Sequence, residues 1–405
     1  MQWHRLPLGR ARSWKSNVKR GRCEIGLPFS ACEVGKGNEK RGKRKIRLLV
    51  SPTPWGEEKA SHYRGVRKCP RAAVQKPYSD IAFPIYKTEK MWYARKRLTE
   101  KLQGGMEREK LGILTNVFYK QREDFAKQQK EQEERFTFPE EVEEITDIVY
   151  IEDGKKEHRL NVYQPKERTQ EKLPVIVNVH GGGMVIGTKE FNRFYCAELV
   201  KTGFLVFSVE YPLIPDCMIY DQFESVSRAM DKIQTLIETY QGNAEKIYAV
   251  ADSGGACLLT YAAAMQNCGA LAEAAGVVPT TLPVRALGLI SGMFYTTKLD
   301  QIGLFLPRYL YGKGKRRKAF KRYEKPDCPE IIKALPPCYL ATSKEDMLEH
   351  YTLQFAKALK ENGVRFQLKD FRKDKKLTHA FSVFDPYLKE SRETMNQMVH
   401  FFEKA

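Results

Sequence analysis

A serine, an aspartate and a histidine that lie far apart in the chain could together carry out nucleophilic chemistry. Ser253 stands in AVADSGGACL, Asp346 in ATSKEDMLEH and His379 in LTHAF. A serine hydroxyl becomes a nucleophile when an imidazole takes its proton, and that imidazole needs a carboxylate to fix its tautomer and stabilise its charge. Taken singly, each residue has an ordinary explanation, since a serine before an apolar helix is usually an N-cap. Their order along the chain, each beside the end of a predicted strand, favours acyl transfer.

A run of three glycines in VNVHGGGMVIG also follows a predicted strand. A flexible turn is one explanation, although clustered glycines cost conformational entropy. A phosphate-binding loop is less well supported, because no Lys-Ser/Thr pair follows and the G-x-G-x-x-G spacing is missing. We expect instead that the backbone N–H groups of Gly182 and Gly183, together with that of Gly254, face a developing oxyanion.

The residues around Ser253 predict a strained turn between a strand and a helix. In such an elbow the side chains two positions before and after the serine must be very small. Gly255 meets this condition, and Ala251 is the smallest departure from the glycine of G-x-S-x-G. We therefore predict a strained but feasible turn.

Alternating strand and helix patterns must position these residues. The predicted strands are ITDIVYIED, HRLNVYQP, LPVIVNVHG, FLVFSVEYP, KIYAVAD, ALGLISGM, PPCYLATS and FQLKDF. The predicted helices are the amphipathic stretch 223–240, GACLLTYAAAM, LEHYTLQFAKALKENG ending at Gly363, and a C-terminal helix. This alternation over some 250 residues predicts an α/β fold with a mostly parallel sheet covered by helices on both faces. Sites in such sheets gather at the carboxyl ends of the strands.

The charge of the chain is concentrated in its first segment. The net charge is +19, but residues 1–90 hold 22 Lys and Arg against 7 Asp and Glu, which leaves 47 against 43 for the rest. A nucleic-acid groove in the main domain therefore gains no support. We predict that residues 1–90 are a mostly disordered extension. It could be a basic tail, a targeting peptide or, as we favour, a segment outside the working protein, with Met91 as its natural start.

Three further regions are expected along the chain. Residues 91–142 are predicted to form an N-terminal helical cap segment, and residues 143–405 the main domain. A basic and aromatic insertion at about 294–335, which contains KGKRRKAFKR, is expected to project over one end of the sheet.

The cysteines and apolar runs indicate the compartment and the chemistry. Nine scattered cysteines without a C-x-x-C pair fit reduced thiols inside a cell. No apolar run is long enough to span a bilayer, and the N-terminus lacks a secretory pattern. We therefore expect a cytoplasmic protein. Neither Cys nor His has metal-ligand spacing, so no metal and no cofactor are predicted, and nothing indicates the oligomeric state.

Several of these motifs together resemble one known family. They are similar to the hormone-sensitive-lipase-like branch of the α/β-hydrolase superfamily, the serine esterases of the HGGG class, over about 145–405. The matching stretches are His180-Gly181-Gly182-Gly183, Asp252-Ser253 within a form of GDSAGG, YPLIP at 211–215 for YRLAP, Asp346-Met347-Leu348 for DPL, and His379-Ala380-Phe381 for HGF.

The resemblance implies an α/β-hydrolase fold whose helical cap is built from 91–142 and 294–335. It implies hydrolysis of small-molecule carboxylic esters with short to medium acyl chains, without a cofactor. Ser253 would be the nucleophile, His379 the general base and acid, and Asp346 its orienting partner. The oxyanion donors would be Gly182, Gly183 and Gly254.

The chain departs from the family pattern without losing a reacting group. Ala251 and Ala256 replace glycines, Pro212 replaces an arginine, and Met347 replaces a proline, which leaves Glu345 as a rival acid. We expect activity, slowed if at all by these changes. The alternative is a catalytically weak or inactive protein that binds a small molecule on the same scaffold. The plant gibberellin receptors resemble this family but have lost the catalytic histidine, whereas this chain keeps one.

Overall fold

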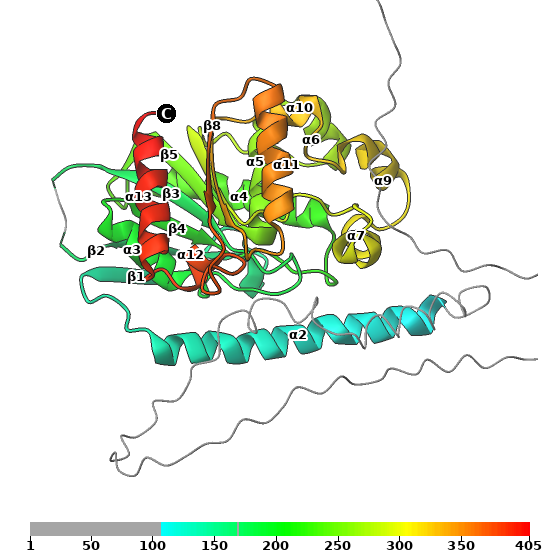
Figure 1. Cartoon of the computed structure of the whole chain (residues 1–405), viewed down its shortest axis with the longest axis horizontal. Helices are drawn as coiled ribbons and strands as arrows, with labels where there is room; N and C mark the ends of the chain where they lie inside the picture. The colour runs from blue at the N-terminus through cyan, green and yellow to red at the C-terminus, as the bar shows by residue number, and fades with distance from the viewer. Residues whose placement is uncertain (1–106, 168–169) are drawn as a thin grey trace, which may run out of the picture. The chain divides into compact units, whose positions relative to one another are not determined.

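The predicted strands form one eight-stranded sheet with the order β1-β2-β4-β3-β5-β6-β7-β8 (Figure 1). The computed structural model describes residues 107–167 and 170–405, so the predictions for 1–90, for Met91 and for 91–106 lie outside it. The strands are β1 (Val142–Val149), β2 (Arg159–Pro165), β3 (Leu173–Val179), β4 (Leu205–Val209), β5 (Gly242–Asp252), β6 (Ala286–Ile290), β7 (Cys338–Ser343) and β8 (Phe366–Phe371).

The sheet is parallel from β4 to β8 and antiparallel at one edge. β1 pairs with β2, and β2 pairs with β4, in antiparallel register, whereas the six strands β4-β3-β5-β6-β7-β8 run parallel. All residues of β4 and β6 are buried, as expected for apolar strands covered on both faces. The predicted α/β class and mostly parallel sheet are confirmed.

Helices cover both faces of the sheet. In Figure 1, α3 and α13 lie on one face, and α4, α5 and α11 lie on the other. These helices are α3 (Arg193–Lys201), α4 (Ile219–Leu236), α5 (Ser253–Asn267), α11 (Glu349–Glu361) and α13 (Lys389–Glu403). The packing is close: the rings of Tyr248 in β5 and Phe402 in α13 stack with centroids 4.7 Å apart. Because helices cover both faces, the parallel strands are accessible to solvent chiefly at their ends.

Helix α2 (Glu107–Arg135) precedes the sheet in the chain and lies within the segment predicted to be helical. Its side chains Phe118 and Phe125 are buried in the same apolar core as the sheet. The ring of Phe125 lies 4.4 Å from that of Phe191, in the loop between β3 and α3. α2 therefore packs on the loop that follows the carboxyl end of β3.

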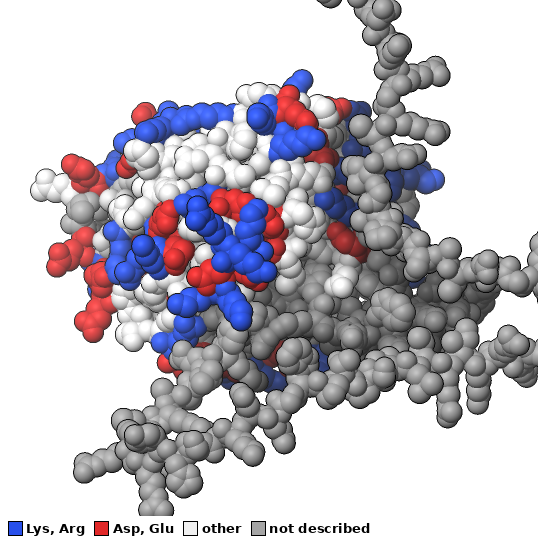
Figure 2. All heavy atoms as spheres, in the orientation of Figure 1, with Lys and Arg blue, Asp and Glu red and all other residues white. Residues whose placement is uncertain are grey.

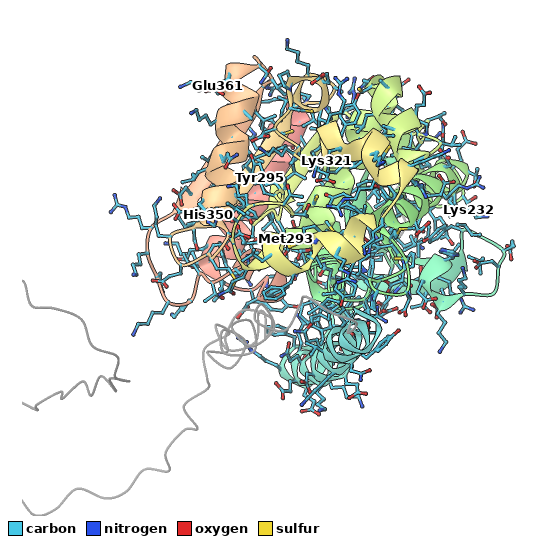
Figure 3. The ribbon with its side chains drawn as sticks, turned by 90° about the vertical axis from the view of Figure 1, so that its right-hand side faces the viewer. Lys232, Met293, Tyr295, Lys321, His350 and Glu361 are labelled. Atoms are coloured by element: carbon cyan, nitrogen blue, oxygen red, sulfur yellow. The ribbon has the colours of Figure 1, made fainter. Side chains whose placement is uncertain are left out.

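The basic insertion folds into short helices: α7 (Gln301–Phe305), α8 (Pro307–Tyr311), α9 (Lys315–Phe320), η4 (Lys321–Tyr323) and α10 (Pro329–Ile332). Figure 3 faces this insertion and shows Tyr295 and Lys321 on it. Phe320 is fully buried against Tyr220 of α4 and Tyr261 of α5. The basic part of the insertion packs on helices α4 and α5, where Phe320 anchors it.

Other features differ in detail from the sequence predictions. The helices α3, α6 (Gly269–Ala275) and α12 (Phe381–Phe384) were not predicted. As predicted, Gly363 follows the end of α11 with a left-handed backbone, φ 70°. On the described part of the face in Figure 2, Lys and Arg are interspersed with Asp and Glu. Among the described residues, no helix combines the length and apolar character that crossing a bilayer requires.

Candidate active site

The structure brings Ser253, Asp346 and His379 together at the carboxyl ends of the strands. His379 Nε2 lies 2.9 Å from Ser253 Oγ, and His379 Nδ1 lies 2.7 Å from Asp346 Oδ1. Ser253 is the first residue of α5 after β5, Asp346 follows β7, and His379 follows β8. All three side chains are buried. Three residues spaced over more than a hundred positions thus form one continuous line of hydrogen bonds.

The backbone at Ser253 has the strained conformation that the sequence predicts. β5 ends at Asp252, and Ser253 has a positive φ of 48°, which is uncommon for a residue with a side chain. A Cβ on Gly255 would lie 2.3 Å from the carbonyl oxygens of both Val179 and His180, so only glycine fits. Ala251 is buried at the end of β5, so its methyl group is accommodated there.

The carboxylate of Asp346 is held from several sides. Its Oδ1 also accepts the backbone N–H of Leu348 at 2.8 Å, and its Oδ2 accepts the hydroxyl of Thr342 at 3.1 Å. Burial alone would raise the pKa of Asp346, but the neighbouring His379 outweighs it and lowers this pKa below its usual value. The rival acid Glu345 instead pairs with Lys373 at 3.5 Å. Asp346 is therefore ionised at neutral pH and faces the imidazole.

The segment that carries His379 is fixed by backbone contacts. Ala380 has a left-handed backbone, φ 53°, and its N–H donates to the hydroxyl of Ser291 at 3.0 Å. The hydroxyl of Ser343 donates to the carbonyl of Leu377. With a carboxylate at Nδ1, the ring proton of neutral His379 resides on Nδ1, so Nε2 is left to accept the proton of Ser253.

Of the three predicted oxyanion donors, Gly254 follows Ser253 directly, and Gly183 lies against Gly254. Gly182 and Gly183 both have positive φ, 105° and 61°. A Cβ on Gly254 would lie 3.0 Å from the backbone nitrogen of Gly183, so these two glycines pack against each other. Gly254 belongs to the first turn of α5, where N–H groups lack carbonyl partners within the helix. Gly182 lies one residue before Gly183, and its carbonyl accepts the N–H of Ile186 at 3.0 Å.

A family model described as alpha/beta hydrolase fold matches residues 176–383, just over half of the chain. The chain belongs to this family. The match begins within β3, takes in the glycine run and the three side chains of the hydrogen-bonded line, and ends in α12. The resemblance predicted from the motifs is thereby confirmed.

Curated relatives of this α/β-hydrolase match over limited stretches. "Probable isoprenylcysteine alpha-carbonyl methylesterase ICMEL1" of Oryza sativa subsp. japonica is 33% identical over 124 residues, 30% of this chain and 28% of that protein. "Versiconal hemiacetal acetate esterase" of Dothistroma septosporum is 24% identical over 204 residues, 47% of this chain and 62% of that protein. The chain thus spans less than two thirds of either relative.

Solved structures are similar to this α/β-hydrolase over more of their length. Esterase B from Lactobacillus rhamnosis has a TM-score of 0.68 at 22% identity, and the match covers 74% of this chain and 96% of that one. The esterase of Pyrobaculum calidifontis has a TM-score of 0.56 at 24% identity, with 71% and 92% covered. At these identities the likeness establishes the fold.

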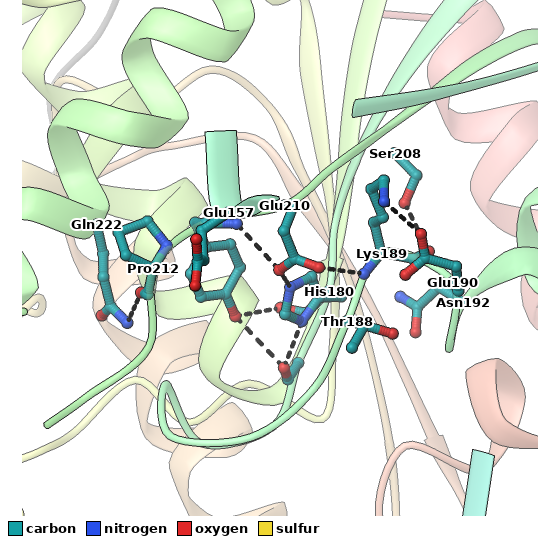
Figure 4. A network of polar contacts seen from close by, with 12 residues as sticks. Glu157, His180, Thr188, Lys189, Glu190, Asn192, Ser208, Glu210, Pro212 and Gln222 are labelled. Atoms are coloured by element: carbon teal, nitrogen blue, oxygen red, sulfur yellow. Dashed lines mark hydrogen bonds and ion pairs between the residues drawn. The ribbon is translucent and has the colours of Figure 1, made fainter. Parts of the chain in front are cut away.

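Behind the glycine run, this α/β-hydrolase has a buried polar network that the sequence analysis missed (Figure 4). His180 Nε2 lies 2.8 Å from Glu210 Oε1, and Glu210 Oε2 accepts the N–H of Lys189 at 3.0 Å. Tyr211 stacks on the His180 ring at 4.3 Å and donates its hydroxyl to the carbonyl of His180 at 2.7 Å. Burial alone would lower the pKa of His180, but the carboxylate of Glu210 and other contacts raise this pKa above its usual value.

Asp252, next to Ser253, supports the glycine run from the other side. Its Oδ1 accepts the N–H of Gly181 and the side-chain amide of Asn192, both at 3.0 Å. Burial raises the pKa of Asp252 above its usual value, against the opposing effect of these hydrogen bonds. The signals for Asp252 and Glu210 were available, since Asp252 ends β5 and Glu210 directly follows β4, whereas nothing in the sequence indicates Asn192.

Aromatic side chains surround a small cavity beside the glycine run. It is bordered by Gly181 and Gly182 and by the rings of Phe125, Phe191 and Phe384. The ring of Phe191 lies 5.1 Å from that of Phe384 in α12. In the described ranges 107–167 and 170–405, no three His, Cys, Asp or Glu side chains are grouped to hold a metal ion.

Proposed function

We propose that this chain hydrolyses carboxylic esters through an acyl-enzyme. The observation that carries the proposal is the line from Asp346 through His379 to Ser253, with contacts of 2.7 and 2.9 Å. This arrangement activates a hydroxyl for attack on a carbonyl. The names of the two relatives, a methylesterase and an acetate esterase, support ester bonds as the substrate.

In the first half-reaction, Ser253 Oγ forms a bond to the ester carbonyl carbon while its proton passes to His379 Nε2. Asp346 stabilises the imidazolium that results. When the tetrahedral intermediate collapses, the bond to the alcohol oxygen breaks, and the alcohol leaves with the proton from Nε2. The acyl group remains as an ester on Ser253.

In the second half-reaction, water takes the place of the alcohol. His379 Nε2 removes a proton from this water as its oxygen adds to the acyl carbon. The bond to Ser253 Oγ then breaks, and Oγ regains the proton from Nε2. The carboxylic acid leaves, and the next cycle starts from the same hydrogen-bonded line.

The N–H groups of Gly182, Gly183 and Gly254 stabilise the negative carbonyl oxygen in both half-reactions. Their proposed role is supported by the contact between Gly254 and Gly183 and by the position of Gly254 in the first turn of α5. Fixed amide donors of this type are worth on the order of 10²–10³ in kcat for a single donor. No metal or cofactor takes part in this mechanism.

The substrate is proposed to be a small ester with a short to medium acyl chain. The acetate and methyl groups in the names of the relatives are consistent with small groups on one side of the ester.

The proposal is tested with p-nitrophenyl esters of increasing acyl length on wild type and Ser253→Ala. We expect wild type to turn over the shorter esters and Ser253→Ala to lose roughly 10⁴–10⁶ in kcat. Ser227→Ala is a matched control, because Ser227 is a buried serine in α4 whose hydroxyl has no described partner. A fluorophosphonate should label wild type at Ser253. Equal rates for wild type and Ser253→Ala would refute the proposal, and a missing label would favour the binding-protein alternative.

A further inference from the structure

Arg122 of α2 binds the loop that carries the oxyanion glycines. Its Nε donates to the carbonyl of Val185 at 3.0 Å. Its Nη2 donates to the carbonyls of Leu213 and Ile214 at 3.0 and 2.8 Å. Its Nη1 pairs with Asp216 Oδ2 at 2.6 Å. A single, partly buried guanidinium therefore joins the loop after β3 to the segment after β4.

The contact with Val185 leads to Gly183 through two peptide groups. The carbonyl of Val185 and the N–H of Ile186 belong to one planar peptide. That N–H donates to the carbonyl of Gly182 at 3.0 Å. The carbonyl of Gly182 and the N–H of Gly183 belong to a second planar peptide. Holding the carbonyl of Val185 therefore holds the direction of the Gly183 N–H.

A second route reaches the same carbonyl from the segment after β4. The N–H of Ile214 donates to the carbonyl of Met184 at 3.0 Å. The peptide of Met184 supplies the N–H of Val185, which donates to the carbonyl of Gly182 at 3.1 Å. That N–H of Ile214 shares a planar peptide with the carbonyl of Leu213, which accepts from Arg122 Nη2 at 3.0 Å. Both routes thus start at Arg122 and end at the Gly182–Gly183 peptide.

The charge of Arg122 acts in the same direction as its geometry. Hydrogen bonds in a chain polarise one another. A cation that donates to the first carbonyl of such a chain makes the N–H of the same peptide, and each N–H after it, a stronger hydrogen-bond donor. The line from Arg122 through Val185 and Gly182 ends at the N–H of Gly183, beside Gly254. We propose that Arg122 is a positioning residue that orients and polarises the Gly183 N–H as an oxyanion donor. This inference rests on the proposed ester hydrolysis.

A purely structural role for Arg122 is the competing explanation. α2 is also anchored elsewhere, since Arg135 pairs with Asp385 at 2.6 Å and Gln132 donates to the carbonyl of Phe384 at 3.3 Å. Arg135 is thus an arginine of the same helix that forms a partly buried ion pair with Asp385, the residue after α12. Arg135→Gln is therefore the matched control for Arg122→Gln.

The experiment compares Arg122→Gln, Arg122→Lys and Arg135→Gln in the full chain. For a p-nitrophenyl ester, we expect kcat to fall about tenfold in Arg122→Gln, less than the loss of a direct donor, with KM nearly unchanged. Arg122→Lys should recover part of this loss, because lysine keeps the charge without the planar fork. The kcat of Arg135→Gln should fall much less than that of Arg122→Gln. Melting temperatures are recorded for all three.

A thionoester analogue separates positioning from stability. Its carbonyl sulfur is a poor hydrogen-bond acceptor, so weaker oxyanion donors should slow it less than the oxygen ester. If Arg122→Gln lowers kcat less for the thionoester than for the oxygen ester, the inference is supported. If it lowers kcat equally for both esters, the inference is overturned. Equal losses in Arg122→Gln and Arg135→Gln also overturn it. If Arg122→Gln does not fold, the same comparison is decided with Arg122→Lys. Failure of the proposed function has a different signature: wild type itself would not exceed Ser253→Ala.

Discussion

The two halves of the candidate site are held in different ways. The half that we propose to move protons consists of side chains that contact one another directly, from Asp346 to His379 to Ser253. The half that would bind the oxyanion consists of backbone N–H groups. Side chains from distant segments hold the backbone of this loop, Arg122 at Val185 and Glu210 at Lys189.

Under the proposed mechanism, this difference separates the side chains that react from the contacts that support the backbone donors. Removing any one of the three hydrogen-bonded side chains should abolish most of the activity, because each one has its own role in the proposed proton transfer. A backbone loop held from several sides loses its geometry in smaller steps, since no single support carries all of it. Substitutions in the first half should therefore act on rate, and those in the second half on rate and stability together.

The largest effect is expected for Asp346→Asn. The amide would favour the wrong tautomer of His379 and cannot stabilise its positive charge, so kcat should fall by roughly 10⁴ with little change in folding. Rates with a p-nitrophenyl ester and a melting curve test this. A loss below about tenfold, in the range of a supporting residue, would remove the distinction between the two halves.

Gly255→Ala should have the next largest effect, on stability. A methyl group there would lie 2.3 Å from two carbonyl oxygens, those of Val179 and His180, and neither is a flexible side-chain end. We expect a loss of about 3 kcal/mol in the free energy of unfolding, as in other overpacked sites. Urea denaturation measures it. Ala251→Gly is the control at the other elbow position, with a loss of at most about 1 kcal/mol.

Glu210→Gln should destabilise the oxyanion half in a pH-dependent way. The contact with Glu210 raises the pKa of His180 in the folded protein above its usual value of 6.5. Its stabilisation is therefore complete below that unfolded value and is lost as pH rises through the raised folded pKa. At about pH 6 the variant should be less stable by about 2 kcal/mol, and this difference should shrink in alkaline buffer. A difference that grows with pH would show that His180 is not the charged partner.

The sequence predicted the fold, and it singled out three side chains that the structure brings together, for a physical reason. Parallel strands need apolar residues on both faces, so β3 to β7 are visible as short apolar runs. The carboxyl ends of β5, β7 and β8 bring Ser253, Asp346 and His379 together. The helix α3 was missed because its buried face includes Tyr195, Cys196 and Glu198, which gives no clear apolar stripe. The predictions for 1–90 remain untested, since these residues lie outside the described part of the chain.

The supporting half could not be predicted in the same way. Arg122 lies in a stretch rich in Lys, Glu and Gln, where an arginine usually faces solvent. Its contacts with Val185 and Ile214 depend on how α2 packs against two loops, which no local pattern encodes. Glu210 directly follows β4, which is a typical position for a site residue, but no spacing in the sequence identifies its partner His180. Contacts that support the backbone depend on the tertiary fold. The side chains proposed to react can instead be recognised from their residue types and their places after predicted strands.

Glu345→Gln should have the smallest effect and tests the acid assignment most closely. Glu345 precedes Asp346 and was the rival acid, but its carboxylate pairs with the exposed Lys373 at 3.5 Å. Surface ion pairs of this kind contribute little, so we expect less than about 0.5 kcal/mol in stability and a kcat within about twofold of wild type. Chemical denaturation and ester hydrolysis, run beside Asp346→Asn, measure both. A loss of kcat in Glu345→Gln that matches Asp346→Asn would mean that the two acids share the imidazole, and the first half of the site would then also depend on a distributed support.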